Sequence, residues 1–254
     1  MLSSDSRKQI VLYDQSIKGG HPVFLDIGDA QPVSLFGGHY HSAAISDKGE
    51  IIFINRDAVK KSPKSRISSI CLPDEEKAVS VACCDDSVVA LSSNGRVFSS
   101  EVQSDSCILK FSSVAELTNQ EIICMSGTNQ YFLAVNKEGR VFGRGFNDYG
   151  QLGLGQKTKK VLTFTEISSL NKYKIRAAYA GDWHSLFETY EGKIIACGYN
   201  EYSQLLLNSN TQEIVYTPIE TSITNSATFC IAGEYLSVVF IGGEPPNRSI
   251  QNYE

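Results

Sequence analysis

The stretch GRVFGRGFNDYGQLGLG, residues 139–155, decides the fold. It is dense in glycine and opens with a short hydrophobic pattern, so it is either a phosphate-binding loop or a turn in a β-structure. A dinucleotide-binding loop needs GxGxxG before a helix. Gly143 and Gly145 fit the first pair, but Asp148 stands where the third glycine is needed, and neither GK(S/T) nor a helical pattern follows. The glycines are therefore expected to permit positive φ angles and close packing where the chain leaves a strand.

The same frame recurs along the chain. The stretch GKIIACGYNEYSQLLL, residues 192–207, repeats it closely, and residues 38–54 and 84–100 repeat it faintly. Each copy carries a glycine at the tip of a predicted hairpin: Gly49, Gly95, Gly139 and Gly192. Spacings near 50 residues without helical periodicity are typical of an all-β repeat, most simply one propeller blade per period.

Each copy predicts four short strands, and the repeats span 33–77, 78–120, 121–173 and 174–226. The segments 8–33 and 227–241 resemble the second and the first half of a copy, so together they predict one shared closing blade. A ring that pairs its own ends leaves no long free sheet edge. We expect a single β-propeller over residues 1–254, with five four-stranded blades. The alternative is an open fragment of a seven-bladed ring.

Composition argues against three classes of protein: general nucleic-acid binders, secreted proteins and membrane proteins. The 254 residues carry a net charge of −5, which argues against a general nucleic-acid binder. No secretion signal or membrane-spanning stretch is apparent. The seven cysteines form no CxxC pair and have no zinc-ligand spacing, so free thiols in a reducing compartment are expected. We predict a monomer of the nucleus or cytoplasm, with neither cofactor nor metal and no membrane partner.

Polar and aromatic residues gather at one end of the predicted blades. The second and third strands of a copy are antiparallel, so the loop before the second and the loop after the third lie on the same face. Aromatic residues among carboxylates on such a face are typical of a protein-binding surface. The candidate partner-binding residues are Tyr40, His41, Asp85, Asp86, Asn129, Gln130, Asp148, Tyr149, Asp182, Trp183, His184, Glu201, Tyr202 and Glu234.

Several of these residues have a structural alternative. His41 and His184 stand at a repeat-defining position and could instead form hydrogen bonds within their blade. Trp183, the only tryptophan, is either an exposed anchor for a partner or buried between blades. Asp182 and His184 are close in sequence, but no serine in a GxSxG elbow accompanies them, so no bond-making chemistry is expected.

Two basic runs interrupt the acidic chain, KKSPKSR at 60–66 and KTKK at 157–160, both where loops or fourth strands are expected. One interpretation is that both runs are solvated surface loops. The alternatives are that KKSPKSR is a nuclear import signal, or that either run contacts DNA phosphates or an acidic partner. The candidate residues are Lys60, Lys61, Lys64, Arg66, Lys157, Lys159 and Lys160.

The frame GxxHSxxxxxxxG(R/K)(V/I)(F/I)xxGxNxYGQLG resembles the repeat of the regulator-of-chromosome-condensation family, most clearly over residues 121–226. The two earlier copies lack GQLG. The resemblance implies a β-propeller, usually of seven blades, for which this chain is too short.

The best-known member of that family is the exchange factor for the GTPase Ran, which also sits on chromatin. The resemblance therefore implies nucleotide exchange on a Ran-like or other small GTPase, although we find no inserted β-wedge here. The positions that match the family's exchange loops include His41, Asp85, Asp86, Asp148, Asp182 and His184. A non-catalytic interaction scaffold, chromatin-associated or not, is the alternative.

Overall fold

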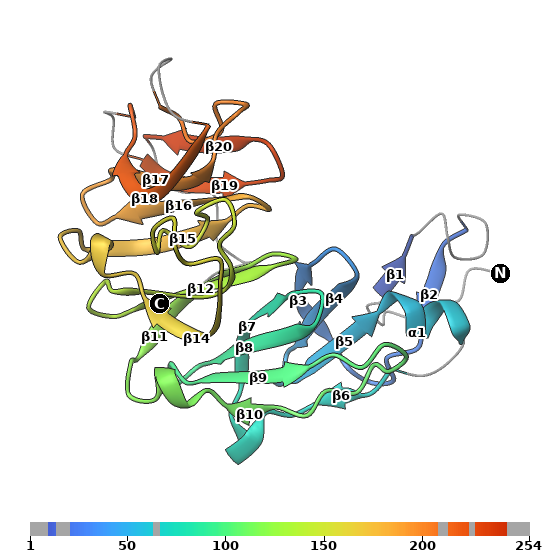
Figure 1. Ribbon diagram of the computed structural model, residues 1–254. Coiled ribbons are helices and arrows are strands. Elements are labelled where there is room, and N and C mark those ends of the chain that lie inside the picture. Colours follow the sequence, from blue (N-terminus) through green and yellow to red (C-terminus); the bar gives the residue numbers. More distant parts are fainter. Residues whose placement is uncertain (1–9, 14–20, 63–66, 208–212, 224–226, 243–254) are drawn as a thin grey trace. The chain divides into compact units, whose positions relative to one another are not determined.

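The computed structural model describes residues 10–13, 21–62, 67–207, 213–223 and 227–242. The chain divides into two compact units, 1–113 and 114–254. Each unit is built almost entirely from antiparallel strands and is described by itself (Figure 1).

The first unit holds one hairpin and two four-stranded sheets. The hairpin pairs β1 (Ile10–Leu12) with β2 (Val23–Leu25). The strands of the two sheets, in spatial order, are β3 (Pro32–Gly37), β4 (His41–Ser46), β5 (Ile51–Asn55) and β6 (Ser69–Ile70), and then β7 (Ala78–Cys83), β8 (Ser87–Ser92), β9 (Val97–Glu101) and β10 (Ser112–Ser113). A short helix, α1 (Arg56–Lys61), follows β5, and a 3-10 turn, η2 (Pro73–Glu75), precedes β7.

The second unit repeats this architecture. Its two four-stranded sheets contain β11 (Ile122–Gly127), β12 (Tyr131–Asn136), β13 (Val141–Phe146) and β14 (Lys160–Glu166), and then β15 (Ile175–Ala180), β16 (His184–Thr189), β17 (Ile194–Tyr199) and β18 (Ile214–Glu220). The hairpin of β19 (Ala227–Ala232) and β20 (Ser237–Ile241) completes the unit. Two 3-10 turns, η3 (Ala115–Leu117) and η4 (Ser168–Leu170), precede β11 and β15.

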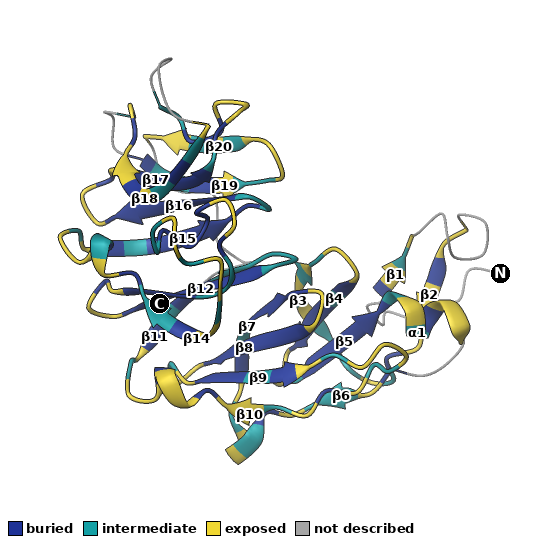
Figure 2. Cartoon of the chain, in the orientation of Figure 1, coloured by how far each residue is buried: buried dark blue, intermediate teal, exposed yellow. Residues whose placement is uncertain are grey.

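The sequence pattern of the strands follows from stacking of the sheets. In β8, β12 and β16 every residue is buried. Within the first unit β4 packs against β7, and within the second unit β12 packs against β15 and β16 against β19, so stacked sheets account for burial of the inner strands. Figure 2 shows the middle strands dark blue and the hairpin tips yellow. In the second unit the sheets share one hydrophobic core, in which Leu133, Leu152 and Phe187 are fully buried.

The all-β prediction is confirmed, as are the turn glycines. Gly49, Gly95, Gly139 and Gly192 all have φ between 75° and 84°, in the left-handed region that the hairpin tips require. Gly145, Gly150 and Gly153 of the opening stretch also have positive φ. The stretch is therefore a strand followed by a tight loop, not a phosphate-binding loop.

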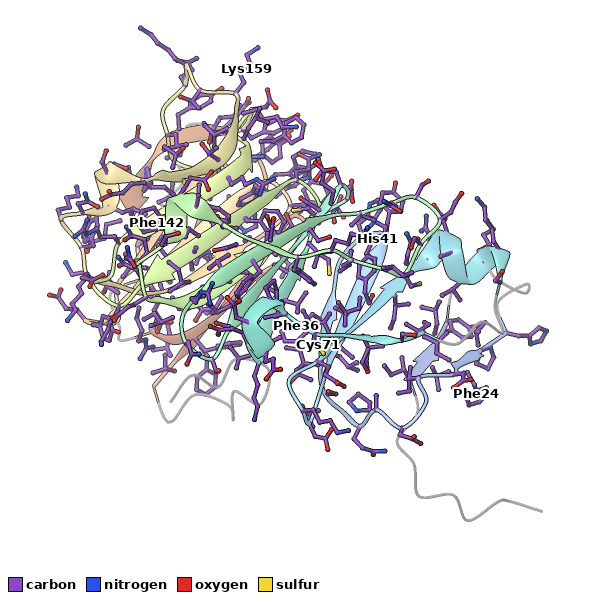
Figure 3. The ribbon with its side chains drawn as sticks, turned by 90° about the horizontal axis from the view of Figure 1, so that it is seen from below. Phe24, Phe36, His41, Cys71, Phe142 and Lys159 are labelled. Carbon is purple, nitrogen blue, oxygen red and sulfur yellow. The ribbon has the colours of Figure 1, made fainter. Side chains whose placement is uncertain are left out.

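The two terminal hairpins are the halves assigned to a shared closing blade. Hairpin β1–β2 buries Ile10 and Val23 against its own unit, while the cross-strand pair Val11 and Phe24 remains 48% and 62% exposed. Phe24 is labelled in Figure 3. Hairpin β19–β20 is likewise a two-stranded sheet. The pairing of the hairpins, and the alternative of an open fragment, stay predictions.

The sequence interpretation missed helix α1, since it assigned residues 60–66 to a loop or fourth strand. Lys60 and Lys61 instead form the last turn of the helix, and Lys64 and Arg66 lie outside the described residues. The Asn55 side chain accepts hydrogen bonds from the backbone N–H groups of Asp57 and Ala58, which makes it an N-cap. Six residues are too few to show a helical period, so only the cap signalled this helix.

Candidate partner-binding rim

Strand register places the two polar loops of each repeat at one end of the sheet. Tyr131 pairs with Gly145 and His184 pairs with Gly198, so the start of the second strand lies beside the end of the third. We call this end of the second unit the rim; its loop segments are 128–130, 147–155, 181–183, 199–206 and 233–236. Tyr149 and Trp183, from loops of two adjacent sheets, have ring centroids 5.1 Å apart. The predicted clustering of these loops is therefore present in the second unit.

An array of five aromatic rings, the aromatic cluster, covers the rim. Its members are Trp183, Tyr149, Tyr199, Tyr202 and Tyr235. Successive rings meet edge to face at centroid distances of 5.1, 5.4, 6.2 and 5.1 Å, which is the arrangement that aromatic quadrupoles favour. The Trp183 side chain acts to lower the pKa of the Tyr235 hydroxyl, against the larger effect of Glu234 that raises it, so the two ends of the array lie near each other. The cluster thus links three successive sheets.

The aromatic cluster faces solvent. Tyr202 is 62% exposed, Tyr235 46% and Tyr149 36%, while Trp183 and Tyr199 are half-buried. Trp183 is therefore neither fully buried between sheets nor fully exposed.

Carboxylates surround the aromatic cluster. Asp148, Glu201 and Glu234 are exposed and Asp182 is half-buried. The hydrogen bond that Tyr235 donates to Glu234 raises the pKa of the Tyr235 hydroxyl, because the negative carboxylate favours the protonated phenol. The rim therefore combines flat aromatic area with negative charge.

The Asn and Gln of the NxYGQLG motif shape the loop that presents Tyr149. The Asn147 side chain accepts a hydrogen bond from Leu152 N at 2.8 Å and donates to the carbonyl of Thr158 at 2.6 Å. Gln151 Oε1 accepts from Tyr149 N at 3.0 Å. Because Asn147 and Gln151 are fully buried, the motif works from inside the loop and leaves the tyrosine ring outside.

The next repeat builds its loop in the same way. Asn200 Oδ1 accepts from Leu205 N and Gln204 Oε1 accepts from Tyr202 N, each at 3.0 Å. Tyr149 and Tyr202 therefore occupy equivalent positions, each held by the hydrogen bonds of its loop and by contacts with neighbouring rings. Such preorganisation lowers the entropic cost of binding a partner.

Gly198 allows the rim strands to approach closely. A Cβ at this position would lie 2.5 Å from the carbonyl oxygen of Trp183, and its φ of 113° is strained for other residues. Tyr199 N donates to the same oxygen at 2.9 Å. The glycine thus sets the position of both Trp183 and Tyr199.

His184 lies inside the rim rather than on it. It is fully buried, and its Nε2 lies 2.8 Å from Ser237 Oγ, in the hairpin beyond its own sheet. Burial lowers the pKa of His184 to about 4, so the ring is neutral at pH 7. His184 thus forms an internal hydrogen bond and does not face a partner. The bond reaches Ser237 of the neighbouring sheet, whereas the sequence interpretation placed it within the blade of His184.

In the first unit, the loops equivalent to the rim loops carry fewer aromatic residues. His41 is buried, with Nε2 3.1 Å from the carbonyl oxygen of Asp85. Partial burial raises the pKa of the Asp85 carboxyl, although His39, 3.9 Å away, opposes the shift. Tyr40 is covered by the guanidinium of Arg56, 4.7 Å from its ring centroid.

The remaining candidates of this class are placed as follows. Asp86 is exposed and accepts a hydrogen bond from Ser87 Oγ at 2.8 Å. Asn129 and Gln130 are half-buried on the rim of the second unit, where the Gln130 carbonyl accepts from Phe146 N at 3.1 Å.

Two of the basic candidates, Lys157 and Lys159, lie in the β13–β14 loop that also carries Tyr149, and the Lys159 carbonyl accepts a hydrogen bond from Asn147 N at 2.6 Å. Lys61 forms an ion pair with Asp105 at 2.5 Å. Lys157 and Lys159 are exposed in the loop before β14, from which Lys159 projects outward (Figure 3), and Lys160 covers the Phe146 ring at 4.1 Å. Among the described residues, no group of three His, Cys, Asp or Glu could hold a metal ion. In the same residues, no helix is long and apolar enough to cross a membrane.

Sequence reasoning missed Tyr199 as a rim residue. It ends β17 immediately before Asn200, and its counterpart in the preceding repeat, Phe146, ends β13 immediately before Asn147. An aromatic residue before the motif's asparagine was therefore a usable signal.

Comparison with known proteins agrees with this architecture. Residues 138–187 match the Regulator of chromosome condensation (RCC1) repeat. This chain contains an RCC1 repeat. Prp20p of Saccharomyces cerevisiae, whose crystal structure was described with its binding properties to Gsp1p and histones, superposes with a TM-score of 0.72 at 15% identity. The match covers 94% of this chain and 62% of that one. Human WBSCR16 superposes with a TM-score of 0.70 at 16% identity, over 87% of this chain and 62% of that one. The RCC1-type β-propeller fold is thereby shown.

Curated relatives match part of this chain. Human Probable E3 ubiquitin-protein ligase HERC4 is 30% identical over 133 residues, which are 52% of this chain and 13% of that protein. The Secretion-regulating guanine nucleotide exchange factor of Bos taurus is 36% identical over 89 residues, which are 35% of this chain and 19% of that protein. The matched segments thus cover less than a fifth of the length of each of these relatives.

Proposed function

We propose that this protein binds a small GTPase, Ran-like or other, through the rim and promotes release of its bound nucleotide. The observation that carries the proposal is the aromatic cluster itself. Five rings from three successive sheets form one solvent-facing surface with carboxylates at its edge. Large aromatic side chains in a polar surround are typical of binding hot spots.

Exchange of this kind needs no bond-making chemistry. A surface that binds the nucleotide-free GTPase more tightly than the nucleotide-bound form lowers nucleotide affinity by the same factor, because the two binding equilibria are linked. A rigid rim suits this role, since Asn147, Gln151, Asn200 and Gln204 hold the loops from inside. Similarity to a guanine nucleotide exchange factor and to the X-linked retinitis pigmentosa GTPase regulator supports this choice of partner.

A panel of purified small GTPases, each loaded with fluorescent nucleotide, tests the proposal. Catalytic amounts of the protein should accelerate nucleotide release from at least one GTPase. The double variant Asp182→Ala/Trp183→Ala should slow that release at least about 30-fold, the effect expected for removal of a hot spot. Tyr190→Leu is the control, because Tyr190 follows β16 beside the hairpin tip, away from the rim. Acceleration of no GTPase, or an equal loss in the control, would reject the proposal.

An adaptor function is the second candidate. It is favoured by the HERC ligases, since the matched region is only a small part of each of those much larger proteins. Under this alternative the rim binds a partner, chromatin included, without releasing nucleotide. Stable GTPase-independent binding to the rim, abolished by the same double variant, would favour the adaptor. We propose a nuclear or cytoplasmic location for the protein under either function.

A further inference from the structure

Among the residues that the structure describes, no Lys or Arg lies over a ring of the aromatic cluster. Elsewhere in the described residues, cations lie over aromatic rings at 4.1 to 5.1 Å. The pairs are Arg56 with Tyr40, Arg96 with Phe98, Lys160 with Phe146, Lys172 with Tyr173 and Lys174 with Tyr190. None of them involves a ring of the cluster. The five rings of the cluster therefore lack the cation contact that other rings in the described part of the chain make.

The loop segments that carry the five rings hold only negative charge, and the basic residues Lys157 and Lys159 follow later in the loop that carries Tyr149. The loop segments 147–151, 181–184, 199–204 and 233–236 contain four carboxylates and neither Lys nor Arg. Asp148 and Glu201 form no ion pair with any residue that the structure describes. A cation placed here would meet aromatic faces and negative charge together.

We propose that the aromatic cluster binds an arginine side chain presented by a basic segment of the partner protein. This inference rests on the proposed function, which brings a protein to the rim, and it adds the chemistry that the partner must present. Arginine fits better than lysine because its planar guanidinium stacks on aromatic rings, binds carboxylates through two parallel hydrogen bonds and is more weakly hydrated. Tyr202 and Tyr235, the most exposed rings, supply the stacking faces, and Glu201 and Asp148 supply the acceptors.

Fluorescence of Trp183 provides a direct assay, because it is the only tryptophan. The probe is a peptide of four Arg-Gly repeats, and matched peptides carry lysine, trimethyl-lysine or glutamine in place of arginine. The arginine peptide should change the Trp183 emission and bind at least about tenfold tighter than the glutamine peptide, given the strength of cation–π contacts. Binding should weaken with salt, because exposed charges are screened.

Variants locate the site. Tyr202→Leu and Glu201→Gln should each weaken the arginine peptide about three- to tenfold. Tyr190→Leu should leave affinity unchanged, since Lys174 already lies 5.1 Å from that ring centroid. Circular dichroism confirms that each variant is folded. Equal binding of the glutamine peptide, an equal effect of Tyr190→Leu, or tighter binding of trimethyl-lysine would overturn the assignment to arginine.

The two proposals fail separately. If a GTPase responds in the exchange assay while the arginine peptide neither binds nor competes, the arginine inference is wrong and the exchange function stands. If the peptide binds at the cluster while no GTPase responds, the arginine inference stands and exchange is rejected.

Discussion

The buried imidazole of His184 makes the stability of the second unit depend on pH. Its Nε2 is paired with Ser237 Oγ, which donates to the carbonyl of Gln204 at 2.7 Å. Its Nδ1 has no hydrogen-bond partner among the described residues. A proton added to this ring would place a charge in a site without solvent, and burial accordingly lowers the pKa from 6.5 to about 4.

The direction of the effect follows from proton binding. As pH falls below 6.5 the unfolded chain takes up a proton at this histidine, while the folded chain does so only near pH 4. Stability from the neutral ring is therefore fully present above pH 6.5 and is lost as pH falls toward 4. The full shift corresponds to about 3 kcal/mol, of which about 2 kcal/mol is lost between pH 7.5 and pH 5.

Urea unfolding followed by Trp183 fluorescence at these two pH values measures the loss. The variant His184→Gln removes the titrating group, so the wild type should lose about 2 kcal/mol more than the variant over this interval. Carboxylates that titrate over the same interval cancel in the comparison. An NMR titration of the wild type should place the His184 pKa near 4 and does not depend on the variant's folding. Equal losses in wild type and variant, or an NMR pKa near 6.5, would refute the reasoning.

Two further substitutions test the rim backbone and the contact between sheets. Gly198→Ala should destabilise the protein by about 1–3 kcal/mol, because the new Cβ lies 2.5 Å from a backbone carbonyl oxygen and φ is 113°; Gly37→Ala, with no atom within 4 Å, should change stability by less than about 0.5 kcal/mol in the same thermal melt. Tyr131→Phe should cost about 1–2 kcal/mol in urea unfolding, because it removes the 2.6 Å hydrogen bond to the carbonyl of His184; an equal loss in the exposed control Tyr190→Phe would argue against that explanation.

The local sequence pattern was sufficient to predict the strands and the hairpin turns that join them. Glycines at fixed spacing predict hairpin tips, because only glycine adopts the left-handed φ at no cost. The second strands were predicted to the residue, as at His41–Ser46 and His184–Thr189, since short segments with an apolar centre, bounded by turn signals and repeated in each copy, are typical of strands. Gly49 and Gly192 have the φ values that this reasoning requires.

Only the tertiary structure decided which polar residues face a partner. His184 is buried because hairpin β19–β20 packs against it and Ser237 pairs with its ring. The sequence around His184 gives no information about that distant hairpin. The aromatic cluster joins Tyr149, Tyr199 and Tyr235 across as many as 86 positions of the chain, and no spacing rule connects them. Periodicity reports interactions between near neighbours, whereas a binding surface is assembled from loops brought together by packing of separate sheets.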